Sequence, residues 1–186
     1  MKTKIEKLTV SAVMIALATV LSMITVWKMP YGGSITLLSM VPIVLVSVRY
    51  GIGWGLCSGF LYSVIQFAQD GFALNWGLSG TVWIVCMLFD YLFPFTLIGL
   101  AGIFRSKGRI GVIVGTAMVL VLRFASHFTT GFTIWASTAA DYGFTSPALY
   151  SLFYNGQYML PELIFTTVAV AIICFIPQGK RLMKLK

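Results

Sequence analysis

The segment VLRFASHFTTGFTIW, residues 121–135, is apolar overall but carries a cation, an imidazole and an indole at regular intervals. Arg123, His127, Gly131 and Trp135 are spaced four residues apart. This spacing is close to one helical turn, so on a helix all four residues share one face. We interpret this stripe as one wall of a binding site for a polar or charged aromatic molecule.

Two carboxylates also lie within apolar segments, Asp90 in FDYLFPF and Glu162 in YNGQYMLPELIF. Counted from the outer ends of the expected helices, Asp90, Arg123 and Glu162 all lie roughly 20 Å deep, so the three could meet. Ionisable groups at such depth are costly and are usually paired or functional. We expect Arg123 to neutralise one carboxylate, most simply Glu162, and to leave Asp90 facing a cationic or hydrogen-bond-donating guest. A purely structural ion cluster at a helix crossing is the alternative.

The polar groups above this layer have a different character. His127 and Asn155 come closer to the outer ends of their segments, and Trp135 and Tyr150 lie at the rim. Tyrosines recur once per turn in the last segment, at Tyr150, Tyr154 and Tyr158. Aromatic walls above carboxylates suit a flat, cationic heteroaromatic ligand. An interfacial aromatic belt would explain Trp135 and Tyr150 without a ligand, but not the deeper His127 and Asn155.

The elements that must position these residues are membrane helices. Of the 186 residues, 59% are hydrophobic and 10% are charged, and the mean hydropathy is +0.93. A soluble domain carries about 25% charged residues. Since a spanning helix needs roughly 20 apolar residues, the sequence predicts an all-α integral membrane protein, one six-transmembrane-helix bundle over residues 1–186. The expected spans are 8–27, 34–50, 51–69, 76–104, 110–136 and 149–176.

The net charge of +8 reflects membrane topology rather than nucleic-acid binding. Eleven basic residues fall on one side of this arrangement: Lys2, Lys4, Lys7, Arg49, Arg105, Lys107, Arg109, Lys180, Arg181, Lys184 and Lys186. The opposite loops hold only Lys28 among basic residues. By the positive-inside rule, both termini are expected in the cytoplasm.

The remaining motifs point to packing or to loops. Cys57, Cys86 and Cys174 lie in separate apolar spans without metal-like spacing, so we expect them to pack as small hydrophobes, and we expect no metal or cofactor. Ala12 and Ala16, one turn apart, permit close approach of another helix, either within the bundle or from a partner. The segment KMPYGGSITLLSMVP reads as a structured outer loop that enters the second span, either a plain turn or a lid.

Four stretches resemble a known family. They are MPYGGSITLLSMVPI, DYLFPFTLIGLAGIF, RFASHFTTGFTIW and LYSLFYNGQYMLPE, and they occur in order over nearly the whole chain. They are similar to the thiamine-specific substrate-binding subunits, or S components, of energy-coupling factor transporters, an ABC-type family. The resemblance implies a six-helix S component in the bacterial cell membrane, with both termini inside, a vitamin site near the outer face, and an outer loop that closes over the vitamin.

The same resemblance implies roles for individual residues. Asp90 matches a carboxylate, Glu in some members, that binds the aminopyrimidine, and Tyr91 follows it as in the family pattern. His127 and Trp135 match the family's His and stacking Trp, and Tyr150 and Asn155 match polar contacts on the sixth helix. Gly131 completes the stripe between them. Ala12 and Ala16 match the small-residue motif that docks on a transmembrane coupling subunit, which works with two ATPase subunits.

Three functional classes fit these residues. The first is a high-affinity thiamine-binding membrane subunit without catalysis of its own, because the sequence contains no G-x-x-x-x-G-K-[ST] phosphate loop. The second is a self-sufficient proton-coupled transporter of a small cationic heteroaromatic substrate, with Asp90, His127 and Glu162 as a proton relay. The third is an intramembrane enzyme with His127 as base. The sequence favours the first.

Overall fold

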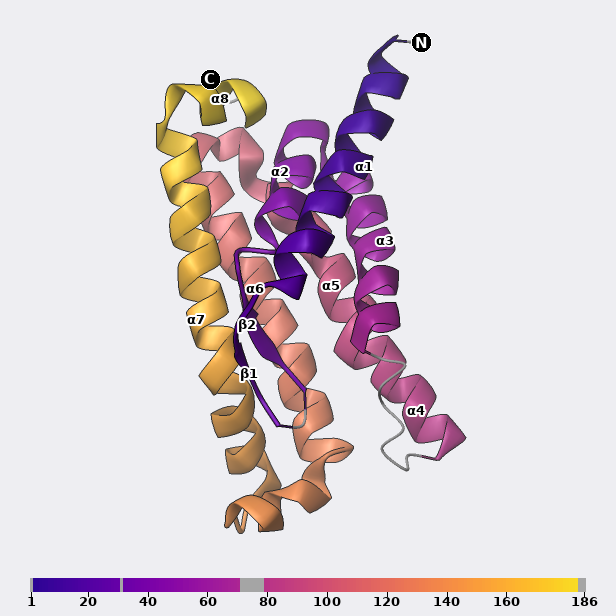
Figure 1. Ribbon diagram of the computed structural model, residues 1–186. Helices are drawn as coiled ribbons and strands as arrows, with labels where there is room; N and C mark the ends of the chain where they lie inside the picture. The colour runs from indigo at the N-terminus through magenta and orange to yellow at the C-terminus, as the bar shows by residue number, and fades with distance from the viewer. Residues whose placement is uncertain (1, 31, 71–78, 184–186) are drawn as a thin grey trace.

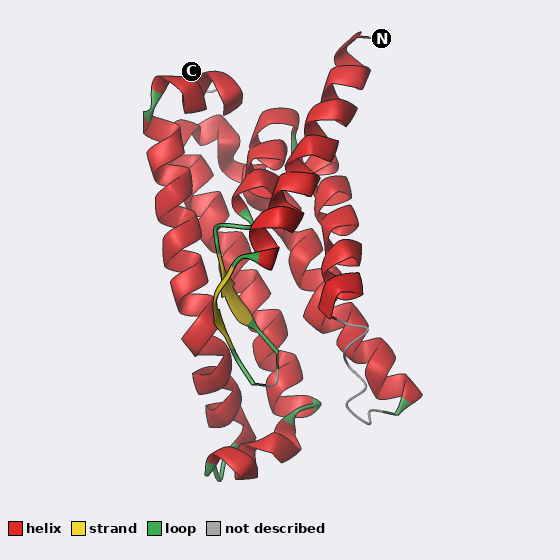
Figure 2. Ribbon diagram, in the orientation of Figure 1, coloured by secondary structure: helices red, strands yellow, loops and turns green. Residues whose placement is uncertain are grey.

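The computed structural model describes residues 2–30, 32–70 and 79–183, and in these residues the chain forms a bundle of long helices (Figures 1 and 2). The first half contains α1 (Lys2–Met23), the antiparallel strands β1 (Thr25–Lys28) and β2 (Ser34–Thr36), α2 (Val41–Tyr50) and α3 (Ile52–Asp70). The second half contains α4 (Gly80–Cys86), the π-helical η2 (Met87–Leu92), α5 (Phe93–Leu97), the 3-10 segment η3 (Ile98–Lys107), α6 (Gly108–Thr133), η4 (Ala136–Tyr142), α7 (Pro147–Phe175) and α8 (Pro177–Met183). The all-α prediction is confirmed.

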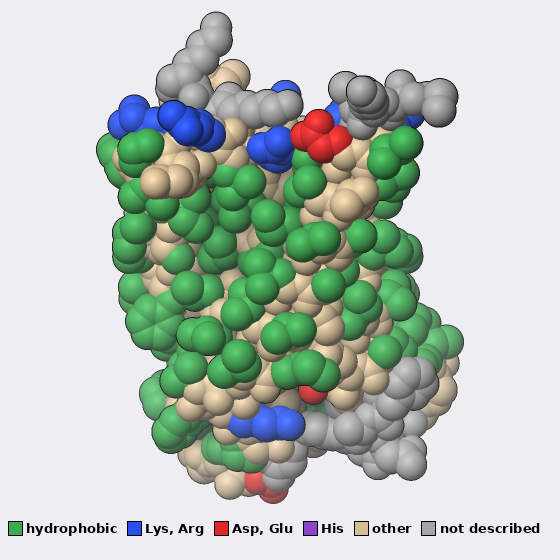
Figure 3. All heavy atoms as spheres, turned by 45° about the horizontal axis from the view of Figure 1, so that its top comes forward, with side chains coloured by type: hydrophobic (Ala, Val, Ile, Leu, Met, Phe, Trp, Pro, Cys, Tyr) green, Lys and Arg blue, Asp and Glu red, His purple; other side chains and the backbone are tan. Residues whose placement is uncertain are grey.

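The two ends of the chain lie at the same end of the bundle (Figure 1). Figure 3 shows Lys and Arg side chains gathered at that end, above a broad band of apolar side chains. Within the described ranges, three helical stretches are long and apolar enough to cross a membrane, Lys4–Met23, Gly80–Thr133 and Pro147–Phe175. The count of six spans therefore stays a prediction.

A β-hairpin lies where the sequence analysis places the end of the first span and the start of the second. Helix α1 ends at Met23 rather than near residue 27, and α2 begins at Val41 rather than near residue 34. The intervening strands are rich in β-branched residues, and Gly32 and Gly33 between them have φ angles of +92° and +83°. The strands are only four and three residues long, so the sequence pattern did not separate them from the ends of the neighbouring spans.

The fourth expected span, 76–104, is helical but not uniform. Its first residues, 76–78, lie outside the described part of the chain, and the helix from Gly80 to Lys107 changes winding three times. The Phe93 N–H donates to the Leu88 carbonyl five residues back, and Pro94 next to it has no N–H to donate. A π turn of this kind shifts the faces of a helix and is frequent at functional sites. It contains Asp90.

The core is centred on α2, which is buried along almost its whole length. The neighbouring elements α3 and η3 approach each other closely through glycines. A Cβ on Gly55 of α3 would lie 2.3 Å from the carbonyl oxygen of Gly99 in η3. Gly55 thus lets α3 pack closely against η3 within the bundle. Helices α6 and α7 run side by side (Figure 1), which brings together the two segments that carry most of the candidate site.

Candidate ligand-binding site

One pocket lies between the hairpin and the helices α3, η2, α6 and α7. All nine residues predicted for the site or its ion cluster line it: Asp90, Tyr91, Arg123, His127, Gly131, Trp135, Tyr150, Asn155 and Glu162. The stripe on α6 forms one wall as expected, although Trp135 comes just after the end of that helix at Thr133. The sequence therefore identified the residues that converge, while their contacts differ in part from those expected.

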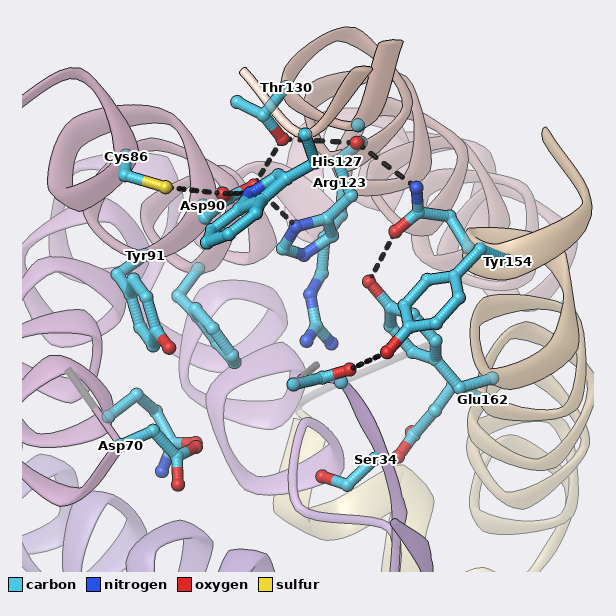
Figure 4. A pocket seen from close by; sticks show the side chains of 18 of the residues that line it. Ser34, Asp70, Cys86, Asp90, Tyr91, Arg123, His127, Thr130, Tyr154 and Glu162 are labelled. Carbon is cyan, nitrogen blue, oxygen red and sulfur yellow. Dashed lines mark hydrogen bonds and ion pairs between the residues drawn. The ribbon is translucent and has the colours of Figure 1, made fainter. Parts of the chain in front are cut away.

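Asp90 is the centre of a hydrogen-bond network (Figure 4). Its Oδ1 accepts from the Thr130 hydroxyl and lies 3.2 Å from His127 Nδ1. Its Oδ2 accepts from Trp135 Nε1 at 3.4 Å and from the Cys86 thiol at 3.1 Å. A carboxylate has about four lone-pair positions. The four groups around Asp90 therefore match its capacity to accept hydrogen bonds.

Thr130 and Cys86 were not among the predicted site residues. Cys86 is buried, as expected for a packing cysteine, but it also donates to Asp90. The helical spacing could have indicated both residues. Cys86 precedes Asp90 by four positions, and Thr130 follows His127 by three, which places each on the same face as its neighbour.

Asn155 and Gly131 hold α6 against α7. The Asn155 amide donates to the His127 carbonyl at 3.2 Å and accepts from the Tyr158 hydroxyl at 2.7 Å. A Cβ on Gly131 would lie 2.2 Å from Ser151 Oγ, so only glycine allows this approach. Both residues line the pocket, and both also fix the distance between its walls.

The hairpin is attached to the tyrosines of α7. The Tyr154 hydroxyl donates to the Gly32 carbonyl at 3.0 Å. A Cβ on Gly33 would lie 2.6 Å from the Tyr158 ring, so the hairpin tip sits directly against that ring. Tyr150 packs on Tyr154 with ring centres 5.5 Å apart. Of the two interpretations of the outer loop, a plain turn or a lid, the contacts of the described residues favour a lid over the pocket.

The expected pairing of Arg123 with Glu162 is not a direct ion pair. In the described part of the chain no ion pair joins them, although both line the pocket. Arg123 instead donates from Nη1 to the Met40 sulfur at 2.8 Å, with its guanidinium 4.1 Å from the centre of the Phe95 ring. Glu162 Oε1 accepts from both the backbone N–H and the hydroxyl of Thr36, at 2.5 and 2.7 Å. Depth along a helix gave the right layer but could not foresee which neighbour each side chain meets.

The proton relay considered in the sequence analysis is not continuous. Within the described residues, Asp90 contacts His127, but no hydrogen bond connects either residue to Glu162. The same residues contain no group of three or more His, Cys, Asp or Glu side chains that could hold a metal ion.

Ala12 and Ala16 lie away from the pocket, on α1. Both are exposed, whereas Ser11, Ile15 and Ala18 on the same helix are buried. Packing within this bundle therefore does not account for the pair, and a face with small residues is open for a partner helix.

Comparison with known proteins identifies the family. A family model described as "Thiamine transporter protein (Thia_YuaJ)" matches residues 8–181. The chain belongs to this family. The resemblance seen in the sequence is thereby confirmed, and so is the expectation of a membrane protein.

Two relatives of this family member agree with the assignment. The thiamine transporter ThiT of Bacillus subtilis (strain 168) is 31% identical over 176 residues, which cover 87% of this chain and 86% of the relative. A solved structure of ThiT from Listeria monocytogenes has a TM-score of 0.75 at 22% identity and covers 97% of this chain and 98% of its own. This second likeness supports the fold.

Proposed function

We propose that this protein binds thiamine in the pocket and acts as the substrate-binding subunit of an energy-coupling factor importer. The observation that carries the proposal is the pocket itself. In a member of the thiamine transporter family, Asp90, His127 and Trp135 meet at one point, beneath aromatic side chains from α7. A carboxylate with aromatic walls suits a flat molecule that has an amino group and a positive charge, as thiamine has.

The roles of the pocket residues follow from their contacts. Asp90 accepts a hydrogen bond from the amino group of the aminopyrimidine, which takes the place of the most distant donor, Trp135 Nε1 at 3.4 Å, while the Cys86 thiol keeps its hydrogen bond to Asp90. Trp135, Tyr91 and Tyr150 provide ring faces for stacking. His127 and Asn155 orient the polar edge, and Gly131 sets the width between α6 and α7.

We further propose that the protein has no catalytic activity or cofactor of its own, and that ATPase partners supply the energy. The exposed Ala12 and Ala16 on α1 are the docking point for a transmembrane coupling subunit, which two ATPase subunits drive. The shared end of the two termini, with its Lys and Arg side chains, faces the cytoplasm, and the hairpin and pocket open toward the outside.

The test is a thiamine titration of the purified, detergent-solubilised protein, followed by tryptophan fluorescence. Stacking on Trp135 should quench the emission saturably, with one thiamine bound per chain. Trp135→Phe should remove most of the signal change, because Trp27, Trp54 and Trp83, the other tryptophans in the described part of the chain, lie outside the lining of the pocket. Asp90→Asn should weaken binding by roughly 100-fold, the loss of a charge-assisted hydrogen bond. A flat titration by both fluorescence and calorimetry would refute the proposal.

A further inference from the structure

Glu162 is the one buried carboxylate among the described residues, with 2% of its surface exposed. It sits on α7 directly after Pro161 and lines the pocket. No motif that we matched to the family assigns a role to it. A buried anion is costly unless it is paired or well hydrogen-bonded, so its position needs a physical reason.

The hydrogen bonds of Glu162 satisfy only one of its two oxygens. Oε1 accepts from the Thr36 N–H and hydroxyl, whereas no hydrogen bond to Oε2 is found in the described part of the chain. The nearby cation, Arg123, is held by Met40 and Phe95 and forms no ion pair with Glu162. The carboxylate is therefore oriented by the hairpin, with capacity left for a cation.

The balance of charge in the pocket points the same way. Arg123 contributes one positive charge, and Asp70, Asp90 and Glu162 contribute one negative charge each, so the four sum to minus two. A guest with a single positive charge lowers this negative charge, and of the three carboxylates only Glu162 is buried. Figure 4 shows the three carboxylates on different walls of the pocket, Asp90 beside His127, Glu162 beside the strand that carries Ser34, and Asp70 apart from both.

We propose that Glu162 is the counter-charge for the cationic ring of the bound vitamin, the thiazolium of thiamine, while Asp90 receives the aminopyrimidine. This inference rests on the proposed function and adds a second carboxylate subsite to it. Glu162 also joins the ligand to the hairpin, because Thr36 belongs to β2. The anion that faces the positive ring is thus the one that holds the base of the lid.

The test compares thiamine with 3-deazathiamine, its uncharged isostere in which carbon replaces the positively charged ring nitrogen. The wild-type protein should bind thiamine at least about tenfold more tightly than the isostere, since a nearby opposite charge in a medium of intermediate dielectric contributes on this scale. Glu162→Gln keeps an oxygen for Thr36 and removes the charge. This variant should lose roughly tenfold to 30-fold in thiamine affinity and change by less than about threefold for the isostere. Retained isostere binding also shows that the variant is folded.

Two control variants separate this role from others. Asp90→Asn should weaken both ligands by the same factor, because both carry the aminopyrimidine. Asp141→Asn removes an exposed negative charge outside the pocket and should leave the preference for thiamine intact.

The experiment tests the role of Glu162 and the proposed binding of thiamine separately. Equal affinity of the wild-type protein for the two ligands would overturn the role of Glu162, and so would an equal loss of both ligands in a folded Glu162→Gln variant. If Glu162→Gln does not fold, the wild-type preference and its retention in Glu162→Asp decide the question. Failure of the wild-type protein to bind either ligand would instead refute the proposed function.

Discussion

Substituting Gly33 by Ala should release the hairpin from the pocket and accelerate the loss of bound thiamine. Gly33 has a φ of +83°, and a Cβ built there would lie 2.6 Å from Cε1, 2.8 Å from Cζ and 2.9 Å from Cδ1 of Tyr158. That ring is 4% exposed, and its hydroxyl donates to Asn155 at 2.7 Å. The ring cannot move aside without breaking this hydrogen bond, so the hairpin tip must lift.

Gly32 provides a matched control for the backbone. Its φ is +92°, but a Cβ built there meets no atom within 4 Å. An L-residue in either conformation costs about 1–2 kcal/mol, so both variants carry this strain. Only Gly33→Ala adds the collision, which costs about 1–3 kcal/mol by analogy with overpacked cores. The difference corresponds to roughly fivefold to 150-fold in a rate or affinity.

The assay is a dissociation chase. Protein loaded with thiamine is mixed with a large excess of a competing ligand, and the recovery of tryptophan emission gives the dissociation rate constant. Gly33→Ala should dissociate faster than Gly32→Ala by that factor, with a smaller change in the association rate. If the two variants dissociate at the same rate, the Tyr158 contact does not hold the hairpin closed, and the reasoning is refuted.

Three other substitutions test the remaining contacts. Gly131→Ala should lower the thermal unfolding temperature and weaken thiamine binding, because overpacking between α6 and α7 costs about 1–3 kcal/mol. The control Gly156→Ala, where an added Cβ meets no atom within 4 Å, should be neutral or stabilising. A Gly131→Ala variant as stable as the wild-type protein would contradict the close approach of the two helices. Ala16→Leu should leave thiamine affinity of the purified protein unchanged and reduce uptake in cells that supply the coupling module, and unaltered uptake would argue against docking at α1. Cys86→Ala should weaken binding by roughly fivefold, since one neutral hydrogen bond contributes about 1 kcal/mol, and Cys86→Ser should restore it; an unchanged Kd in the Ala variant would show that the thiol has no part in binding.

The convergence of the site could be predicted because long helices impose a face on each residue. Arg123, His127, Gly131 and Trp135 line one wall for the reason that their spacing indicated. Tyr150 and Asn155 meet them because α7 lies beside α6. Periodicity is preserved through any helical bundle, so these residues did not depend on knowledge of the topology.

The pairing of charges could not be predicted in the same way. Counting residues from a helix end gives the height of a side chain but not the neighbour that it meets, and Thr36 is 126 residues away from Glu162 in sequence. The hairpin that carries Thr36 was hidden because its strands are only four and three residues long, too short to show a clear alternation of apolar and polar residues. The contact between the Arg123 guanidinium and the Phe95 ring could not be predicted either. An aromatic ring and a carboxylate can both bind a guanidinium, and the sequence does not show which of them lies nearer to Arg123.

The short side chain of Asp90 accepts hydrogen bonds from residues on both sides of the pocket. Its carboxylate receives donors from Cys86 on α4, from Thr130 on α6, and from Trp135 beyond the end of α6. The π turn at Met87–Leu92 redirects the helix where Pro94 removes a backbone donor, so the backbone supplies orientation that a longer Glu side chain could supply by itself. Because the same carboxylate also ties α4 to α6, removing it altogether would disturb packing as well as binding. Asn at this position keeps the size and one acceptor oxygen, and its effect on thiamine affinity therefore measures the lost charge rather than a collapsed wall.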